Sequence, residues 1–197
     1  MEITPETIKD HLPYYLTQEA KIGIVQELQK FPDNLQYYLQ GQYEEEMLQG
    51  DGWRQLHLRN FETGEKALVN GVVLSNTCDV APENKRELPV NVVFAPLVPL
   101  SAYQGLLANA GLSEQSIKAK FEAIRKQRVT NLFYVPAGSG LEADHIVLLD
   151  DVHTMPARAL ETRTSTKIFT LSQAGFYLFI LKLSIHFCRF HENVARS

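Results

Sequence analysis

Side chains that could do chemistry follow two apolar runs that lie far apart in this sequence. Cys78 and Asp79 come shortly after the first run, and His153 comes shortly after the second. A thiol with a nearby imidazole base is the arrangement that nucleophilic catalysis by cysteine requires. The sequence therefore predicts a candidate catalytic group of Cys78, Asp79 and His153, with His145 as an alternative base.

Each of these residues also has a structural interpretation. Cys78 can be a small buried apolar residue, and Asp79 can bond to backbone N–H groups in a turn. Asp151 and His153, two residues apart on a strand, share one face and can form a hydrogen bond or an acid/base pair. Because no other His or Cys lies at ligand spacing, the sequence predicts no metal and no other cofactor.

Further polar residues are candidates for binding a ligand or a partner. Those beside the two apolar runs are Ser75, Asn76, Asp151 and Arg158. Lys182, His186 and Arg189 form a polar stripe on the apolar helix expected over residues 170–193. The stripe could contact phosphates, but long basic side chains also cover apolar surface or pair with acids, here those of residues 1–51. The basic residues of 118–128 present the same choice.

Short strands and helices must position these residues. The apolar patterns predict strands over residues 53–58, 66–75, 91–98, 131–135 and 145–149. Pro96 lies in the third of them and cannot donate to a ladder, so that strand should be an edge strand or carry a bulge. Ser113 is a cap in the helical insertion of residues 101–128, and Thr170 with Gln173 is a capping box for the C-terminal helix. The predicted class is α+β, with a small closed antiparallel barrel.

Charge divides the chain unevenly. Residues 1–51 hold ten acids and three bases, and the remainder holds thirteen acids and sixteen bases. This predicts an acidic helical extension over residues 1–49 and a barrel domain over residues 50–197, with the acids either masking a basic surface or forming a solvated face. The apolar stretch 174–181 is too short to cross a bilayer, two cysteines make no disulfide framework, and the first residues lack a secretory pattern. We therefore expect a cytoplasmic protein without a membrane segment.

Three of these segments resemble the MazF/PemK toxin family, whose barrel is related to that of CcdB. The segments are residues 71–76, 92–97 and 147–160. The resemblance implies a Src-homology-3-like barrel, a homodimer, an endoribonuclease that needs no metal, and restraint by an acidic antitoxin. It covers about residues 50–190, without the 101–128 insertion.

The family's catalytic positions differ in this chain. The positions of its arginine and threonine are Val69 and Val98 here, and neither side chain can donate a hydrogen bond. Losing one positioned donor typically costs about 10²–10³ in rate. The family's chemistry therefore requires that Lys66 or His153 has taken over.

The function predicted from the sequence is that of a MazF/PemK-like protein of a toxin–antitoxin or defence-type system. Such a protein binds RNA or a protein partner. Two alternatives belong to other classes. One is a thiol-dependent enzyme that uses Cys78, Asp79 and a barrel histidine, and the other is a non-catalytic protein-interaction module.

Overall fold

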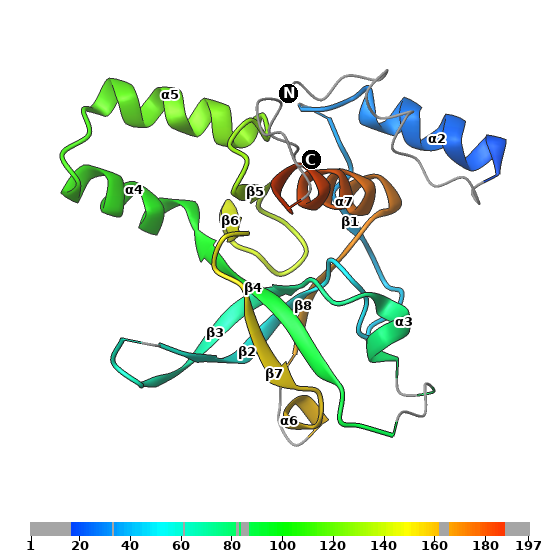
Figure 1. Cartoon of the computed structure of the whole chain (residues 1–197). Helices are drawn as coiled ribbons and strands as arrows, with labels where there is room; N and C mark the ends of the chain where they lie inside the picture. The colour runs from blue at the N-terminus through cyan, green and yellow to red at the C-terminus, as the bar shows by residue number, and fades with distance from the viewer. Residues whose placement is uncertain are drawn as a thin grey trace, which may run out of the picture.

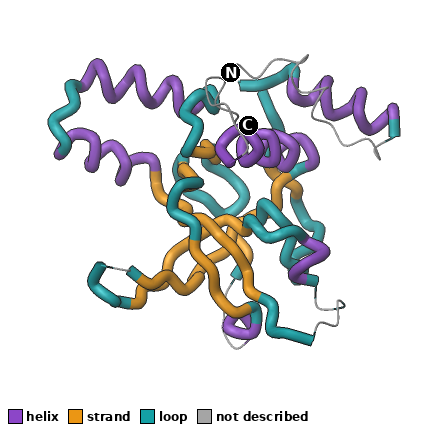
Figure 2. Tube along the Cα trace, in the orientation of Figure 1, coloured by secondary structure: helices purple, strands orange, loops and turns teal. Residues whose placement is uncertain are grey.

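The chain folds as a mixed α+β protein around one antiparallel sheet that curls into a half-barrel (Figures 1 and 2). The computed structural model describes residues 17–32, 34–60, 62–81, 83, 87–161 and 166–187. Its helices are α2 (Gln18–Leu28), α3 (Thr77–Val80), α4 (Leu100–Asn109), α5 (Glu114–Arg125), α6 (Arg158–Glu161) and α7 (Gln173–Phe187). Its strands are β1 (Tyr38–Leu39), β2 (Gly52–Arg59), β3 (Lys66–Val73), β4 (Asn91–Pro99), β5 (Leu132–Val135), β6 (His145–Leu148), β7 (His153–Pro156) and β8 (Lys167–Leu171).

The central strand β4 lies between the two apolar runs that precede the candidate residues. These runs are β3, before Cys78 and Asp79, and β6, before His153. The strand order is β1-β8-β2-β3-β4-β6-β5, and β7 also pairs with β4. Phe94 of β4 lies between Val73 of β3 and His153 of β7, and Leu97 pairs with Val147 of β6. Both segments are strands of one sheet, as predicted, but they are not adjacent, because β4 lies between β3 and β6.

Pro96 shows why β4 tolerates a proline. The edge-strand alternative is wrong, because β4 has partners on both sides. On the side of β4 away from β3, however, two different strands pair with it. β7 pairs with residues of β4 up to Phe94, and β6 pairs with residues of β4 from Leu97 onward. Residues 149–152 connect β6 to β7 and belong to neither strand. The missing N–H of Pro96 therefore falls where the ladder is interrupted.

The sheet is not closed, which corrects the expected closed barrel. β8 pairs with β2 only through Gly52 and Trp53, so the rest of β2 has no strand on that side among the described residues. Among the residues that the structure describes, β7 pairs only with β4, and it lies beside β2 without joining it in the sheet (Figure 1). We call the gap between these two strand edges the seam.

The N-terminal residues that the structure describes belong to the main core. Ile24 and Leu28 of α2, with Tyr37 and Tyr38, pack in one buried cluster with Phe179 and other side chains of α7 and the sheet. Removing residues 1–49 would therefore remove core side chains and strand β1. Such a truncation cannot report on masking of a basic surface.

Strand β8 changes the start of the C-terminal helix. The capping box at Thr170 is wrong, because Thr170 is a buried strand residue paired with Leu39. Ser172 caps α7 instead: its Oγ accepts from the N–H of Gly175 at 3.1 Å. The helix begins at Gln173 rather than at 170, and residues 188–193 of the predicted helix lie outside the described residues.

The insertion predicted over residues 101–128 forms two helices rather than one. α4 ends before Gly111, whose φ of +83° a side chain rarely adopts, and Ser113 caps α5 by accepting from the N–H of Ser116 at 3.2 Å. Beyond α5, the Gln127 side chain pairs with edge strand β5. Its Oε1 accepts from the N–H of Tyr134 at 3.1 Å, and its Nε2 donates to the Tyr134 carbonyl at 2.8 Å.

Candidate functional site

The polar loop after β3 is built by its own hydrogen bonds. Ser75 Oγ accepts from the N–H of Val93 at 2.8 Å, which ties the loop to β4. Asn76 Oδ1 accepts from the N–H of Cys78 at 2.9 Å and caps the short helix α3. Ser75 and Asn76, predicted as binding residues, therefore shape the loop that presents Cys78 and Asp79.

Cys78 and Asp79 are both exposed in α3. The structure does not place His145 near them. His145 pairs with Pro99, whereas Val73, at the end of β3, pairs with Phe94. Five residues of strand correspond to about 16 Å at about 3.3 Å per residue. The Nδ1 atom of His145 also lies 2.7 Å from the carbonyl oxygen of Ala143.

His153, the other predicted base, pairs with a carboxylate. Its Nε2 lies 2.8 Å from Asp151 Oδ1, and its ring packs on Phe94 with centroids 5.7 Å apart. Its side chain is 10% exposed, against 50% for Asp151. His153 and Asp79 line different hollows, so a joint role with Cys78 stays a prediction.

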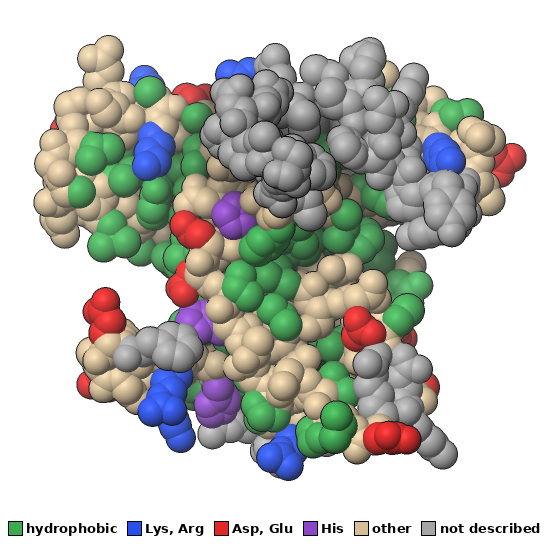
Figure 3. Space-filling view, in the orientation of Figure 1, with side chains coloured by type: hydrophobic (Ala, Val, Ile, Leu, Met, Phe, Trp, Pro, Cys, Tyr) green, Lys and Arg blue, Asp and Glu red, His purple; other side chains and the backbone are tan. Residues whose placement is uncertain are grey.

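The seam contains a hollow of about 510 Å³. Four of its lining side chains are basic residues: His57, Arg59, Lys66 and His153. The others that line it are Leu58, Val152, Thr154, Met155, Pro156 and Ala159, so no carboxylate is among the lining residues. We call this site the seam hollow. Figure 3 shows histidine and basic side chains close together at the lower left, over β2, β3 and β7.

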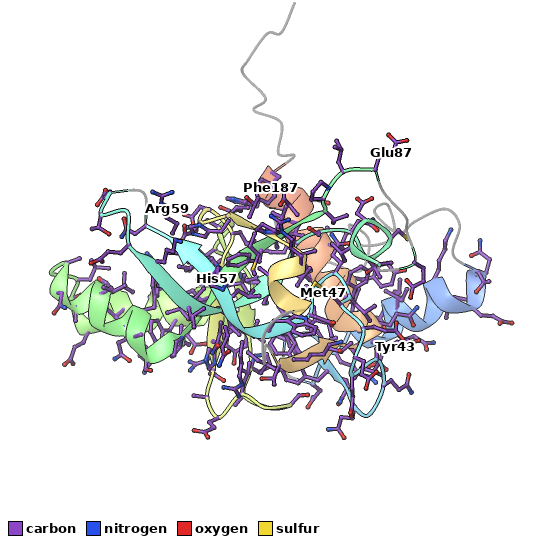
Figure 4. The ribbon with its side chains drawn as sticks, turned by 90° about the horizontal axis from the view of Figure 1, so that it is seen from below. Tyr43, Met47, His57, Arg59, Glu87 and Phe187 are labelled. Atoms are coloured by element: carbon purple, nitrogen blue, oxygen red, sulfur yellow. The ribbon has the colours of Figure 1, made fainter. Side chains whose placement is uncertain are left out.

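Strands β2 and β3 supply most of this charge. His57 and Arg59 are two residues apart on β2 (Figure 4) and therefore share a face. Arg59 pairs directly with Lys66 of β3. Like charges opposite each other in an antiparallel pair destabilise it, and an anion bound between them removes that cost.

Sequence reasoning named Lys66 and His153 and missed His57 and Arg59. The available signal was their spacing of two residues at the end of the strand predicted over residues 53–58. What the sequence could not provide is the approach of β7 to β2, which brings His153 to the same hollow. Arg158, predicted as a binding residue, follows β7 in the chain and is exposed at the start of α6.

The polar stripe predicted on the C-terminal helix is not one surface. Lys182 is 1% exposed, and its Nζ donates to the carbonyl of Gln127 at 2.5 Å. Burial lowers the pKa of Lys182 from 10.5 to about 8. His186 contacts the ring of Phe187 with centroids 4.6 Å apart, and Arg189 lies outside the described residues. The Lys182 ammonium is thus inside the protein and cannot contact a phosphate on its surface.

A buried ion pair ties β8 to the beginning of β2. Lys167 Nζ lies 2.7 Å from Asp51 Oδ2, which also accepts from the N–H of Leu48 at 2.9 Å. Burial raises the pKa of Asp51, and the hydrogen bond from Lys167 opposes that shift. Asp51 Oδ1 has no hydrogen-bond partner among the described residues. This pair holds β8 against the beginning of β2.

Comparison of the sequence with known proteins does not assign the chain to a family. The sequence matches no family model and no curated protein. Among the described residues, no three His, Cys, Asp or Glu side chains are grouped so as to hold a metal ion, and no helix is long and apolar enough to cross a membrane.

Proposed function

We propose that this chain binds RNA through the seam hollow. The observation that carries the proposal is the four side chains His57, Arg59, Lys66 and His153 around one hollow with no carboxylate among its lining residues. Binding a phosphate backbone depends mainly on positive side chains that neutralise phosphates. The open seam also exposes the hollow between two strand edges.

The choice of RNA is also supported by the resemblance to the MazF/PemK toxins. A half-barrel of antiparallel strands is compatible with the Src-homology-3-like barrel that the resemblance implies. Val69 and Val98, at the family's catalytic positions, are partly buried and pack in apolar clusters. The proposed site therefore uses other residues. In this proposal the protein acts in a toxin–antitoxin or defence-type system.

In the proposed site, His153 acts as the general base for cleavage of the bound RNA. Cleavage of RNA through its 2′-hydroxyl forms an O2′–P bond and breaks the P–O5′ bond. It requires a base for the hydroxyl proton, which is His153 in this proposal, a proton for the leaving 5′-oxygen, which water supplies, and positive charge beside the phosphate. Asp151 orients the His153 ring, as a carboxylate orients the imidazole in other acid/base groups. Arg59 and Lys66 supply the charge.

Titration of labelled single-stranded RNA, followed by fluorescence anisotropy, tests binding. We expect Arg59→Glu or Lys66→Glu to weaken binding on the order of tenfold, and to reduce the salt dependence by about 0.7 for each lost phosphate contact. Lys118→Glu is the matched control, because Lys118 is an exposed base on α5. An equal loss of affinity in Lys118→Glu would place the RNA on the basic helix and contradict the proposal.

Two further measurements separate RNA from the alternatives. An acidic protein partner carries the same charge as RNA, so binding of polyglutamate without binding of RNA would refute the proposal. Cleavage products of end-labelled RNA test the role of His153: His153→Asn should lose cleavage and weaken binding less than Arg59→Glu does. Cleavage that persists in His153→Asn and is lost in Cys78→Ala would favour the thiol-dependent enzyme instead.

A further inference from the structure

A second hollow, of about 670 Å³, lies where the chain that follows β1 leaves the sheet. β1 pairs with β8 only at Tyr38 and Leu39. Gly41 then has a φ of +68°, which a side chain rarely adopts, and the chain does not continue along β8. The hollow is lined by residues 39–42, 44 and 45 on this side and by residues 166–170 of the β8 segment. We call it the β8 hollow, and its size is that of a small-molecule site.

The side chains that line the β8 hollow offer several kinds of hydrogen bond. They include carboxylates, amides and hydroxyls, among them Glu44, Glu45, Gln40, Gln42, Ser139 and Thr166. Lys167 is the base among the lining residues, and its ammonium is already paired with Asp51 at 2.7 Å. The two glutamates therefore give this lining a negative charge, whereas the seam hollow has a basic lining.

Trp53 adds a hydrogen-bond donor that the described residues do not use. It lines the β8 hollow and is 9% exposed, and its Nε1 atom is buried with no hydrogen-bond partner among the described residues. Lys167 Nζ lies 5.6 Å from the centroid of a Trp53 ring, but an ammonium only donates and cannot accept from the indole. It donates instead to the carbonyl of Tyr43, a residue labelled in Figure 4. Because a buried N–H without a partner is costly, this atom indicates a missing acceptor.

We propose that the β8 hollow binds a neutral, hydroxyl-rich ligand, namely a monosaccharide or a disaccharide. A hydroxyl both accepts and donates, so one sugar can accept from Trp53 and donate to Glu44 and Glu45. An anion can accept from the indole, but the two carboxylates repel it. An ammonium can pair with the carboxylates, but it has no acceptor for the indole. The aromatic rings of Trp53 and Phe169, which also line the hollow, offer apolar surface to the carbon atoms of a sugar ring.

This inference does not depend on the RNA proposal. Among the described residues, none lines both the seam hollow and the β8 hollow. The negative charge of Glu44 and Glu45 disfavours a phosphate in the β8 hollow. Loss of RNA binding in a seam variant should therefore leave sugar binding unchanged.

Proton NMR of the full chain tests the proposal directly. Trp53 is the only tryptophan of the chain, so the protein has a single indole N–H signal. We expect a saturable downfield shift of this signal on titration with at least one of glucose, N-acetylglucosamine and maltose, because the N–H gains an acceptor. Gluconate, an anion of similar size, and putrescine, a diamine without an acceptor, should leave the signal unchanged. No shift with any of the three sugars, or an equal shift with gluconate or putrescine, would overturn the proposal.

Two neighbouring glutamates provide a matched pair of variants. Glu45 lines the β8 hollow, whereas Glu46 is also exposed but is not among the lining residues. Glu45→Ala should weaken sugar binding about tenfold, because a hydrogen bond to a charged group is lost. Glu46→Ala should retain the natural affinity. An equal loss in both variants, or no loss in Glu45→Ala, would show that the sugar does not bind in this hollow.

Discussion

Replacing the buried Lys182 by methionine should change how stability depends on pH. The Lys182 ammonium is 1% exposed, and its pKa is lowered from 10.5 to about 8 by burial. In the unfolded chain the pKa returns to its ordinary value. Between these two values the unfolded state binds more protons than the folded state, so the free energy of unfolding rises with pH. Below about pH 8 the full cost of burying the charge remains.

The size of this effect follows from the two pKa values. A difference of 10.5 − 8 = 2.5 units corresponds to about 3.4 kcal/mol at 1.36 kcal/mol per unit. The folded protein recovers about 2 kcal/mol of this between about pH 8 and pH 10. Lys182→Met removes that rise. It also removes the hydrogen bond to the Gln127 carbonyl, worth about 1 kcal/mol, but that loss is nearly constant with pH over this range.

Urea unfolding at several pH values from about 8 to 10 measures the difference. At each pH, the free energy of unfolding of the variant is subtracted from that of the natural protein. This difference cancels the contribution of Tyr37 and Tyr38, whose raised pKa values reduce stability above about pH 10 in both proteins. Lys118→Met, at an exposed position, should retain the natural slope. Identical slopes in the natural protein and Lys182→Met would refute the reasoning.

Two other substitutions test how the elements are joined. Gln127→Ala should lower the free energy of unfolding by about 2–4 kcal/mol, because it removes the two hydrogen bonds between the Gln127 amide and the backbone of Tyr134. Urea unfolding measures this loss, and a value below about 1 kcal/mol would contradict the prediction. Gly175→Ala should cost about 1–3 kcal/mol, since a Cβ there would lie 2.5 Å from the carbonyl oxygen of Tyr37. Its matched control, Gly23→Ala in α2, meets nothing within 4 Å and should stabilise by about 0.5–1 kcal/mol. Equal melting temperatures for the two alanine variants would show that α7 does not approach Tyr37 closely.

The sequence predicted the strands that carry strong apolar runs. The segments predicted around Trp53, Val72, Phe94, Phe133 and Val147 are all strands, with ends that differ from the prediction by at most two residues. Each contains side chains that are buried within the sheet, and such runs are the most direct sequence signal for a strand. The local pattern was sufficient for these elements.

Elements fixed by distant contacts were missed. β8 begins with Lys167, a residue that is rare in strand interiors and is stabilised here by Asp51. Lys182 fits an exposed polar stripe by its spacing, yet it is buried because the end of α5 offers it a carbonyl. The seam hollow likewise depends on the approach of His153 to β2. Local periodicity carries no information about any of these approaches.

The hydrogen bonds along the outer edge of β5 affect how copies of this protein can aggregate. Strand edges with free backbone groups recruit strands of other molecules. Here the Gln127 amide occupies both backbone groups of Tyr134, the N–H of Leu132 donates to the Val129 carbonyl, and the Tyr38 hydroxyl donates to the carbonyl of Pro136. Strand-by-strand growth into fibres is therefore blocked at this border of the sheet.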